Sequence, residues 1–478
     1  MKKIRNLIIA FLILALLVGG YFLALKLTKE PEPEELAEEI VAEEFDRSLL
    51  EKIEYFYAGE EISLSHEGES WIFSPKPALP IVQSTVETMA ETASKVVADR
   101  LVASVNDDLS EFGFEEETLA VSFTLAGGEK KTYTFGEINQ MTGGYYFRTD
   151  EGENVYLVPS SVLSAFTKRT VDLIKLDEIP AVDTSNLLSA SLSLPGKEPV
   201  ALTRLAEGYT GYHTQYSCFS VKGDKEKTPA DSALGDQFFS LIASLSLKNY
   251  YDYAPDAETE ASYGLGADKK ALLKVDYAEL LDSSTEEDTI TQTVTRSFTL
   301  EIGSQTPDGG VYARLGDSDM ICSINAADSD LLLSYADADL SSRDIFGLDF
   351  ESVGKLTLSF GGEQYTVSYR DNEDDYFFEN EDESKSRNAE VDAFSAFYQA
   401  LTELKAERID DSLAAGEEVL RFGADLVNDD GTANGNVTLS LSRIGEEGYL
   451  ASFDGHTGLF CAADAVTPIF TKLEEILK

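Results

Sequence analysis

The sequence predicts an α+β protein in which an N-terminal transmembrane helix precedes three tandem repeats of an antiparallel-sheet module with two helices each. Three observations lead to this fold class. The chain begins with a long uncharged apolar run, the remainder alternates strand-like runs with amphipathic helical runs, and several stretches match later stretches without gaps. A length of 478 residues also exceeds what a single hydrophobic core usually serves.

The N-terminal segment has the composition of a membrane anchor. Lys2, Lys3 and Arg5 precede an apolar run of 19 residues at positions 7–25, which is roughly 28 Å as a helix and close to the hydrocarbon thickness of a bilayer. A cleaved signal peptide is the alternative, but its apolar region is usually shorter and ends in small residues. No cysteine stands directly after the run, which excludes lipoprotein processing. We therefore predict residues 1–29 to be a cytoplasmic tip and a transmembrane helix.

The basic residues before this run predict its orientation. Positive charge favours the cytoplasmic side, and the first five residues outweigh Lys26 and Lys29 beyond the run. We expect a single-pass protein of the cell membrane with a cytoplasmic N-terminus and an extracytoplasmic C-terminal body. The glutamate-rich residues 30–46 form the predicted acidic linker between them.

The charge of the chain excludes some partners. Its 87 acidic and 38 basic residues give a formal net charge of −49, so no basic surface is predicted that could neutralise phosphates, and we expect no nucleic acid as partner. The acidic surface is interpreted as one that keeps an exported body soluble. Three cysteines are too few for a disulfide framework.

Two sets of segments recur at nearly constant offsets. Three short segments share the offset of 304 that separates Gly144 from Gly448: residues 144–147, 155–157 and 166–168 match residues 448–451, 459–461 and 470–472. A helical run with apolar residues three or four positions apart recurs at the offset of 308 that separates Val86 from Phe394. The middle copy offers a similar helix around Phe238 and a similar strand around Tyr312.

Each copy reads as a hairpin, a helix, a meander of strands and a second helix, such as residues 160–173 or 462–477. An aromatic residue followed by glycine comes after the first helix of each copy, at Gly113, Gly264 and Gly423. Glycine pairs, for example Gly361 with Gly362, are predicted to be hairpin turns. The predicted modules are residues 47–178, 179–340 and 341–478.

These features resemble one bacterial family, catalogued as domain of unknown function 4340. The resemblance rests on the N-terminal span, the acidic linker, a Phe-Gly-Phe step at residues 112–114, a Gly-Tyr-Tyr strand at 144–146 and a Val-Tyr-Leu-Val strand at 155–158. It implies an accessory subunit on the outer face of an ABC-type transport system related to gliding-motility complexes. The family provides no catalytic residues that could be transferred to this chain.

The chemically reactive residue types give no site. His66 and His456 lie in predicted exposed turns, His213 stands apart, and no zinc-binding spacing joins the three. The repeat places Cys322 and Cys461 at the strand position of Leu157, which favours small core residues over nucleophiles. Cys218 lies in a similar strand-like context. We predict no catalytic, cofactor-binding or metal-binding residues.

Other sequence signatures are missing as well. There is no Gly-x-Ser-x-Gly elbow, no phosphate-binding loop and no dinucleotide fingerprint, so we expect no bound nucleotide and any ATPase would be a partner. The acidic runs at residues 371–375 and 379–383 lack the glycine of an EF-hand loop and are interpreted as solvated loops around a short strand. Paired carboxylates remain open, because so many acidic residues form close pairs by accident.

The leading hypothesis is therefore a membrane-anchored, non-enzymatic binding or scaffold subunit outside the cytoplasm, accessory to an ABC-type transport or gliding-motility-like envelope complex. Two alternatives stay open. One is a hydrolase of cell-envelope polymers that uses paired carboxylates, and the other is a structural or adhesive surface protein.

Overall fold

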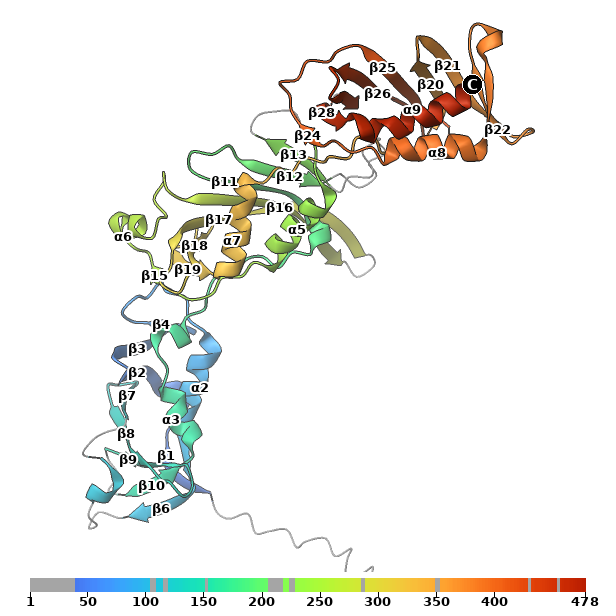
Figure 1. Cartoon of the computed structure of the whole chain (residues 1–478). Coiled ribbons are helices and arrows are strands. Elements are labelled where there is room, and N and C mark those ends of the chain that lie inside the picture. The colour runs from blue at the N-terminus through green and yellow to red at the C-terminus, as the bar shows by residue number, and fades with distance from the viewer. Residues whose placement is uncertain are drawn as a thin grey trace, which may run out of the picture. The chain divides into compact units, whose positions relative to one another are not determined.

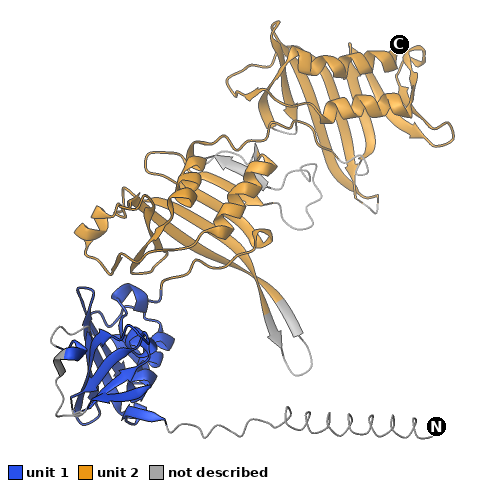
Figure 2. Cartoon of the chain, turned by 60° about the horizontal axis from the view of Figure 1, so that its bottom comes forward, with its two compact units in different colours: residues 1–175 blue, residues 176–478 orange. Residues whose placement is uncertain are grey.

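The structure, a computed structural model, describes residues 39–478 except 104–108, 115–118, 151–153, 205–217, 223–227, 285–288, 349–352, 429–430 and 454–455. The chain divides into two compact units, Met1–Lys175 and Leu176–Lys478 (Figure 2). The first unit holds an eight-stranded and a two-stranded sheet, and the second holds two nine-stranded sheets.

An eight-stranded antiparallel sheet with the order β4-β3-β2-β7-β8-β9-β10-β6 forms the body of unit 1. Its strands are β2 (Leu50–Tyr57), β3 (Glu60–Glu67), β4 (Ser70–Phe73), β6 (Arg100–Ala103), β7 (Leu119–Leu125), β8 (Lys130–Ile138), β9 (Tyr145–Thr149) and β10 (Val155–Val158). Helices α2 (Gln83–Ser94) and α3 (Ser160–Phe166) lie side by side (Figure 1), and α4 (Thr170–Leu173) follows.

The small sheet of unit 1 pairs β1 (Ile40–Glu44) with β5 (Lys95–Ala98). The last residues of the predicted acidic linker are thus part of the folded body. Lys131 and Glu43, which form an ion pair with an N–O distance of 3.1 Å, have side chains only 11% and 14% exposed. A partly buried pair of this kind fixes β1 more firmly than an exposed pair would.

Unit 2 begins with a nine-stranded antiparallel sheet in the order β14-β13-β12-β11-β16-β17-β18-β19-β15. Its strands are β11 (Leu187–Ser193), β12 (Val200–Arg204), β13 (Cys218–Lys222), β14 (Thr228–Pro229), β15 (Asp252–Tyr253), β16 (Ala271–Ser284), β17 (Thr289–Gln305), β18 (Val311–Leu315) and β19 (Met320–Ile324). Its helices are α5 (Ser232–Ser244), α6 (Ala257–Ser262) and α7 (Ala326–Ser334).

The second nine-stranded sheet of unit 2 has the order β23-β22-β21-β20-β25-β26-β27-β28-β24. Its strands are β20 (Val353–Phe360), β21 (Glu363–Arg370), β22 (Asp375–Glu379), β23 (Arg387–Glu390), β24 (Arg408–Ile409), β25 (Glu418–Val427), β26 (Ala433–Ile444), β27 (Gly448–Phe453) and β28 (His456–Ala462). Helices α8 (Val391–Thr402) and α9 (Ala463–Leu477) lie side by side on one of its faces (Figure 1).

All three large sheets share one connectivity. A run of strands leads from the centre to one edge, and a meander of four strands leads to the other. A short strand between the first helix and the meander, β6 in unit 1, closes that second edge. The turns predicted from glycine pairs are confirmed: Gly361 and Gly362 join β20 to β21, and both have positive φ angles of 61° and 82°. Such angles suit glycine because it lacks a Cβ.

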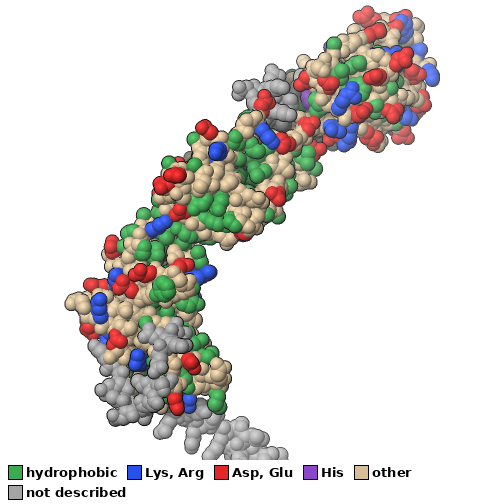
Figure 3. Space-filling view, turned by 60° about the vertical axis from the view of Figure 1, so that its left-hand side comes forward, with side chains coloured by type: hydrophobic (Ala, Val, Ile, Leu, Met, Phe, Trp, Pro, Cys, Tyr) green, Lys and Arg blue, Asp and Glu red, His purple; other side chains and the backbone are tan. Residues whose placement is uncertain are grey.

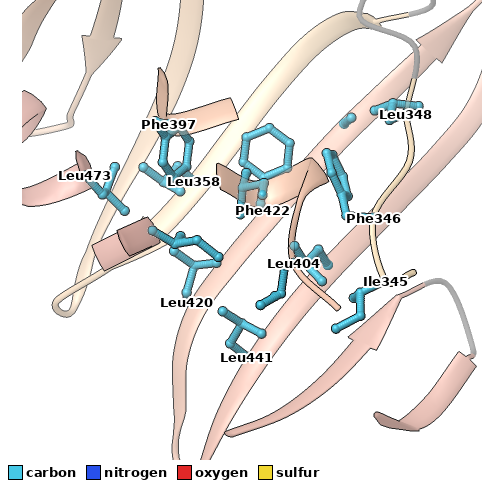
Figure 4. Close-up of a cluster of buried hydrophobic side chains, with 14 of the residues drawn as sticks. Ile345, Phe346, Leu348, Leu358, Phe397, Leu404, Leu420, Phe422, Leu441 and Leu473 are labelled. Carbon is cyan, nitrogen blue, oxygen red and sulfur yellow. The ribbon is translucent and has the colours of Figure 1, made fainter. Parts of the chain in front are cut away.

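The core of the last sheet lies between its strands and helices α8 and α9. Leu358 of β20 is 1% exposed, and Phe397 of α8 and Leu473 of α9 are fully buried. Phe346, which precedes the sheet, packs edge-on against Phe422 of β25 with ring centroids 5.5 Å apart. Figure 4 shows these side chains gathered between the elements. Strand residues alternate between this core and the opposite face of the sheet.

The segment at the predicted module boundary near Arg343 is hydrogen-bonded on both sides. The backbone N–H of Asp231 donates to the carbonyl of Leu340 at 2.8 Å, and the N–H of Ala406 donates to the carbonyl of Arg343 at 2.7 Å. The chain between the two nine-stranded sheets is therefore paired with residues from both sides of it.

The predicted fold class is wrong. The described chain is mostly β, with four antiparallel sheets, and only the last of the three predicted modules has two α-helices. The helix expected at residues 160–173 is interrupted because Thr167 leaves helical geometry and the side chain of Asp172 accepts a hydrogen bond from the N–H of Arg169, which starts α4. The second module gains the short helix α6, whose first turn is capped by Asp256.

The predicted transmembrane helix at residues 7–25 lies outside the described residues. Among the residues that the structure does describe, none of the helices is both long and apolar enough to cross a bilayer. Figure 3 shows acidic side chains spread over the visible face, with basic side chains between them.

The aromatic-glycine signature marks a close backbone approach in only two of the three copies. Gly113 lies against Glu137 of β8, and Gly264 lies against Ser304 of β17. In the third copy Gly423 lies instead within β25, so the predicted equivalence is wrong there. The corresponding approach to β26 uses Gly416, where a Cβ would come within 2.1 Å of the carbonyl oxygen of Arg443.

Candidate ligand-binding site

An open polar pocket of about 590 Å³ lies on the last sheet. Strands β20, β21, β22 and β25 and the segment after β22 contribute to it. The polar residues that line it are Thr357, Ser359, Gln364, Thr366, Glu379, Asn380, Glu381, Glu383 and Arg421. We call it the β20–β22 pocket.

The floor of the β20–β22 pocket follows from strand alternation. Leu358 and Tyr365 point into the core, so their strand neighbours point to the face turned away from α8 and α9. Leu358 pairs with Tyr365, which sets Thr357, Thr366 and the residues beside them next to one another across the two strands. The tight turn at residues 361–362 fixes this register.

One wall of the pocket is the segment between β22 and β23. Asn380 is 7% exposed, and its side-chain amide donates to the carbonyl of Gln364 at 3.0 Å and to Glu363 at 3.2 Å. Its Oδ1 accepts from the N–H of Asp382 at 2.9 Å. The guanidinium of Arg387 donates to the carbonyl of Ser384 at 2.9 Å. These bonds hold the wall in place without occupying its outer carboxylates.

The charge in the pocket is negative. Glu379, Glu381 and Glu383 are its acidic lining residues. Arg421 supplies positive charge, but its guanidinium is held by Glu418 through two bonds of 2.9 and 2.7 Å. The exposed carboxylates of the wall therefore dominate the local field.

Such a lining suits a ligand with several hydroxyl or amino groups. Hydroxyl and amide side chains on the floor can donate and accept, and carboxylates on the wall accept from hydroxyl groups or pair with an ammonium. Acid-base hydrolysis by paired carboxylates would need one carboxyl group with a raised pKa. Every carboxyl group in the described residues for which a shift is resolved has its pKa lowered, as at Glu60 and Asp382.

A second, smaller pocket of about 370 Å³ lies in unit 1 around the only tryptophan. Trp71 donates its indole N–H to Glu87 at 3.2 Å, and the guanidinium of Arg47 pairs with the same carboxylate. His66 packs edge-on against Trp71 with ring centroids 5.0 Å apart. Because these side chains bond to or pack against one another, we interpret the cluster as a structural contact that joins β3 and β4 to α2.

A third pocket of about 370 Å³ borders α8 and is aromatic. Tyr376 stacks on Phe394 with ring centroids 3.9 Å apart, and Phe394 lies 6.3 Å from the ring of Tyr398. Ser395, Gln399 and Thr402 of α8 complete its lining.

The histidines do not form a site. His66 is exposed but lies in strand β3 instead of a turn, and His456 is only 9% exposed at the start of β28 instead of in an exposed turn. Burial lowers the pKa of His456, and the negative charge of Asp411 opposes this effect. His213 lies outside the described residues.

The cysteines lie in the core or are not described in full. Cys322 and Cys461 are fully buried in β19 and β28, the strands that correspond to β10 with Leu157, which confirms their interpretation as core residues. Burial raises the pKa of both thiols to about 12. Cys218 lies in β13, and its side chain is not among those that the structure describes.

The acidic runs at residues 371–375 and 379–383 flank β22, as the sequence predicts. Tyr369 donates to Asp374 at 2.7 Å, and Arg370 forms two bonds to Asp375 at 2.9 and 2.6 Å. In the described part of the chain no group of three or more metal-ligating side chains is placed to hold an ion. Sequence analysis missed the polar pocket next to these runs, although the alternating hydroxyl residues at Thr357 and Ser359 signalled a polar sheet face.

Comparison with curated proteins and with solved structures gave no match. The sequence model of one family matches the chain twice, over residues 71–268 and 252–421, and its description is Domain of unknown function (DUF4340). The two matches overlap within the first nine-stranded sheet region and together cover most of the chain. The chain therefore belongs to the family of domain of unknown function DUF4340.

Proposed function

We propose that the protein is a non-catalytic binding subunit outside the cytoplasm, accessory to an ABC-type transport or gliding-motility-like envelope complex. The observation that carries the proposal is the β20–β22 pocket, which is open, polar and lined by groups suited to holding a ligand. The apolar sequence at residues 7–25 would keep this body at the membrane.

The ligand of this pocket would carry hydroxyl groups and an amine. Glucosamine and N-acetylglucosamine make a matched pair of probes, because they share a ring but only the first has a positive charge. We expect glucosamine to saturate the pocket at lower concentration than N-acetylglucosamine and to lose this advantage at high salt. Ligand-observed NMR on the full chain measures both.

Two variants localise the binding. Glu381→Gln removes a wall carboxylate and should weaken glucosamine more than N-acetylglucosamine. Thr438→Val changes the same sheet outside the pocket and should change neither. Equal binding of both sugars, or equal loss in both variants, would show that the pocket is not the ligand site.

The partner complex is tested separately. The full chain, extracted from membranes in mild detergent, should copurify with an ATPase and a permease in fixed ratio, as measured by quantitative mass spectrometry. A chain that lacks residues 1–29 should lose them. Recovery of the full chain from membranes without transporter subunits would argue against the accessory role.

The orientation has its own test. Protease added to intact spheroplasts should degrade the body, whereas a tag placed before Lys2 should survive. Survival of the body with loss of the tag would reverse the proposed orientation.

A further inference from the structure

Strands β16 and β17 extend beyond the neighbouring strands of their sheet, β11 and β18. Neighbouring β11 pairs with β16 only as far as Tyr277, and β18 pairs with β17 only as far as Leu300. From Ala278, opposite Thr295, the two strands continue as pairs of each other to Ser284, opposite Thr289. Residues 278–284 and 289–295 therefore form a two-stranded ribbon. Figure 2 shows the orange part of this hairpin extending past the sheet.

This ribbon is an addition to the shared fold. In unit 1 the corresponding pair is β7 and β8, with 7 and 9 residues, and in the last sheet it is β25 and β26, with 10 and 12 residues. Strands β16 and β17 have 14 and 17. In the last sheet β20 follows β25 to Leu426, near its end. The fold forms twice without the extension, so the extension serves another purpose.

Within the described part of the chain, both outer edges of the ribbon lack a partner strand. None of the described strands pairs with β16 beyond Tyr277 or with the outer side of β17 before Leu300. An open edge offers a row of backbone N–H and C=O groups that another strand can pair with, and proteins usually protect such edges with lysine, proline or a bulge. The sequence from 278 to 295 has no lysine and no proline, and its pairing has no register shift.

The faces of the ribbon are also exposed. The side chain of Leu280 is 63% exposed and that of Leu281 is 39% exposed. Adjacent strand residues point to opposite faces, so each face presents one leucine. A two-stranded ribbon is only marginally stable alone in water. A third strand would cover an edge and part of both leucines at once.

The charge of the ribbon selects its partner. Its described residues, 278–284 and 289–295, contain Glu279 and Asp282 and no basic residue, in a chain whose formal net charge is −49. Arg296, just outside, pairs with Glu279 at 2.7 Å. A second copy of the same ribbon would repel this charge, whereas a segment with lysine or arginine would be attracted.

We propose that the ribbon binds an extended, basic segment of a partner protein by strand addition. Backbone hydrogen bonds along the open edge would supply affinity, and Leu280 and Leu281 would contact alternate side chains of the added strand. This surface goes beyond the proposed function, because it requires neither the β20–β22 pocket nor the membrane anchor.

The test uses a synthetic peptide of alternating valine and threonine flanked by lysines, added to the purified full chain. Amide hydrogen exchange, read by mass spectrometry, should slow about tenfold in peptides from β16 and β17 beyond Tyr277 and Leu300. The same peptide with glutamate flanks should protect much less. A lysine-flanked peptide with alternate amides N-methylated should not protect, because it cannot extend the ladder.

Two variants test whether the peptide binds at the ribbon. Replacing residues 278–295 by Asn-Gly closes the hairpin between the register partners Tyr277 and Arg296, and should abolish binding. The double variant Leu280→Ser with Leu281→Ser keeps the ribbon and should weaken binding at least several-fold. It therefore still tests the proposal if the shortened chain fails to fold. Glucosamine binding at the β20–β22 pocket should be unchanged in both.

Protection elsewhere in the chain, or equal protection by the glutamate-flanked peptide, would overturn the proposal. A dimer that light scattering detects in the full chain and not in the Asn-Gly variant would also overturn it, because the ribbon would then bind a second copy of itself.

Discussion

The backbone N–H of Ser304 donates a hydrogen bond to the carbonyl of Tyr263 at 2.8 Å. This contact joins the loop after α6 to strand β17, at the point where β17 shifts register against β18. Gly303 permits it, because a Cβ there would lie 2.2 Å from the same carbonyl oxygen. The same arrangement recurs in unit 1, where Gly136 faces the carbonyl of Phe112.

Gly264, next to this contact, should tolerate no side chain. Its φ angle is +74°, and an added Cβ would lie 2.5 Å from the backbone nitrogen of Ser304. We expect Gly264→Ala to lower the free energy of unfolding of unit 2 by about 2 to 4 kcal/mol, from left-handed strain plus the steric clash. Chemical denaturation followed by near-UV circular dichroism measures it.

Gly196 provides the control for Gly264. Its φ angle of +75° is nearly the same, but an added Cβ would meet no atom within 4 Å. Gly196→Ala should therefore cost only about 1 kcal/mol, the strain alone. Equal losses in the two variants would contradict the role assigned to the Ser304 contact.

The buried thiols should be chemically silent. Burial raises the pKa of Cys322 and Cys461 to about 12, so at pH 8 their thiolate fraction is roughly a thousandfold below that of a free cysteine. In a Cys218→Ser background, Ellman's reagent should label neither thiol in the native chain over hours and both within minutes in guanidinium. Fast labelling of the native chain would place at least one thiol at the surface.

The stability of unit 2 should fall on acidification through His456. Burial lowers its pKa below the ordinary value of 6.5, so below that value the unfolded chain binds a proton that the folded chain does not. Stability from this group is full above about pH 6.5 and is lost as the pH falls through the lowered folded-state pKa. Thermal unfolding of unit 2, followed by near-UV circular dichroism between pH 5 and 7, should show this slope.

His456→Gln should flatten that slope, because the substituted side chain does not titrate. His66→Gln, at an exposed position of unit 1, should leave the slope of unit 2 as it is. An unchanged slope in His456→Gln would assign the pH dependence to other titratable groups of unit 2, namely its carboxyl groups or His213. Trp71, the only tryptophan, reports unit 1 separately by fluorescence.

The parts of this fold that local sequence determines are the ones that sequence analysis predicts. Turns at Gly361 and Gly362 and the apolar helix face around Phe394 depend on neighbours a few residues away, and both are found. The burial of His456 depends on residues far away in the sequence. For example, Asp411 packs against Gly458, which lies in β28 two residues after His456. A Gly-His-Thr sequence alone resembles an exposed turn, so this burial could not be predicted.

The candidate site and the ribbon were missed for a related reason. The β20–β22 pocket combines residues from β20 to β25 that become neighbours only through strand pairing. The alternating sequence of β16 and β17 predicts strands, but the end of a sheet is set by where β11 and β18 stop. The exposure of Leu280 is therefore determined by where the neighbouring strands end, and the alternating sequence of β16 does not reveal it.

Tyr55 ties the central strand of unit 1 to its helical layer. The side chain is 4% exposed, and its hydroxyl donates to the carbonyl of Lys168, between α3 and α4, at 2.9 Å. Tyr55→Phe leaves that carbonyl without this donor and should lower the stability of unit 1 by about 1 to 2 kcal/mol. The fluorescence of Trp71 during urea unfolding measures it.

Tyr57 lies on the same strand, and its hydroxyl has no hydrogen bond within the described residues. Tyr57→Phe should therefore change the midpoint little, and a loss as large as that of Tyr55→Phe would show that removing any hydroxyl from β2 has the same effect.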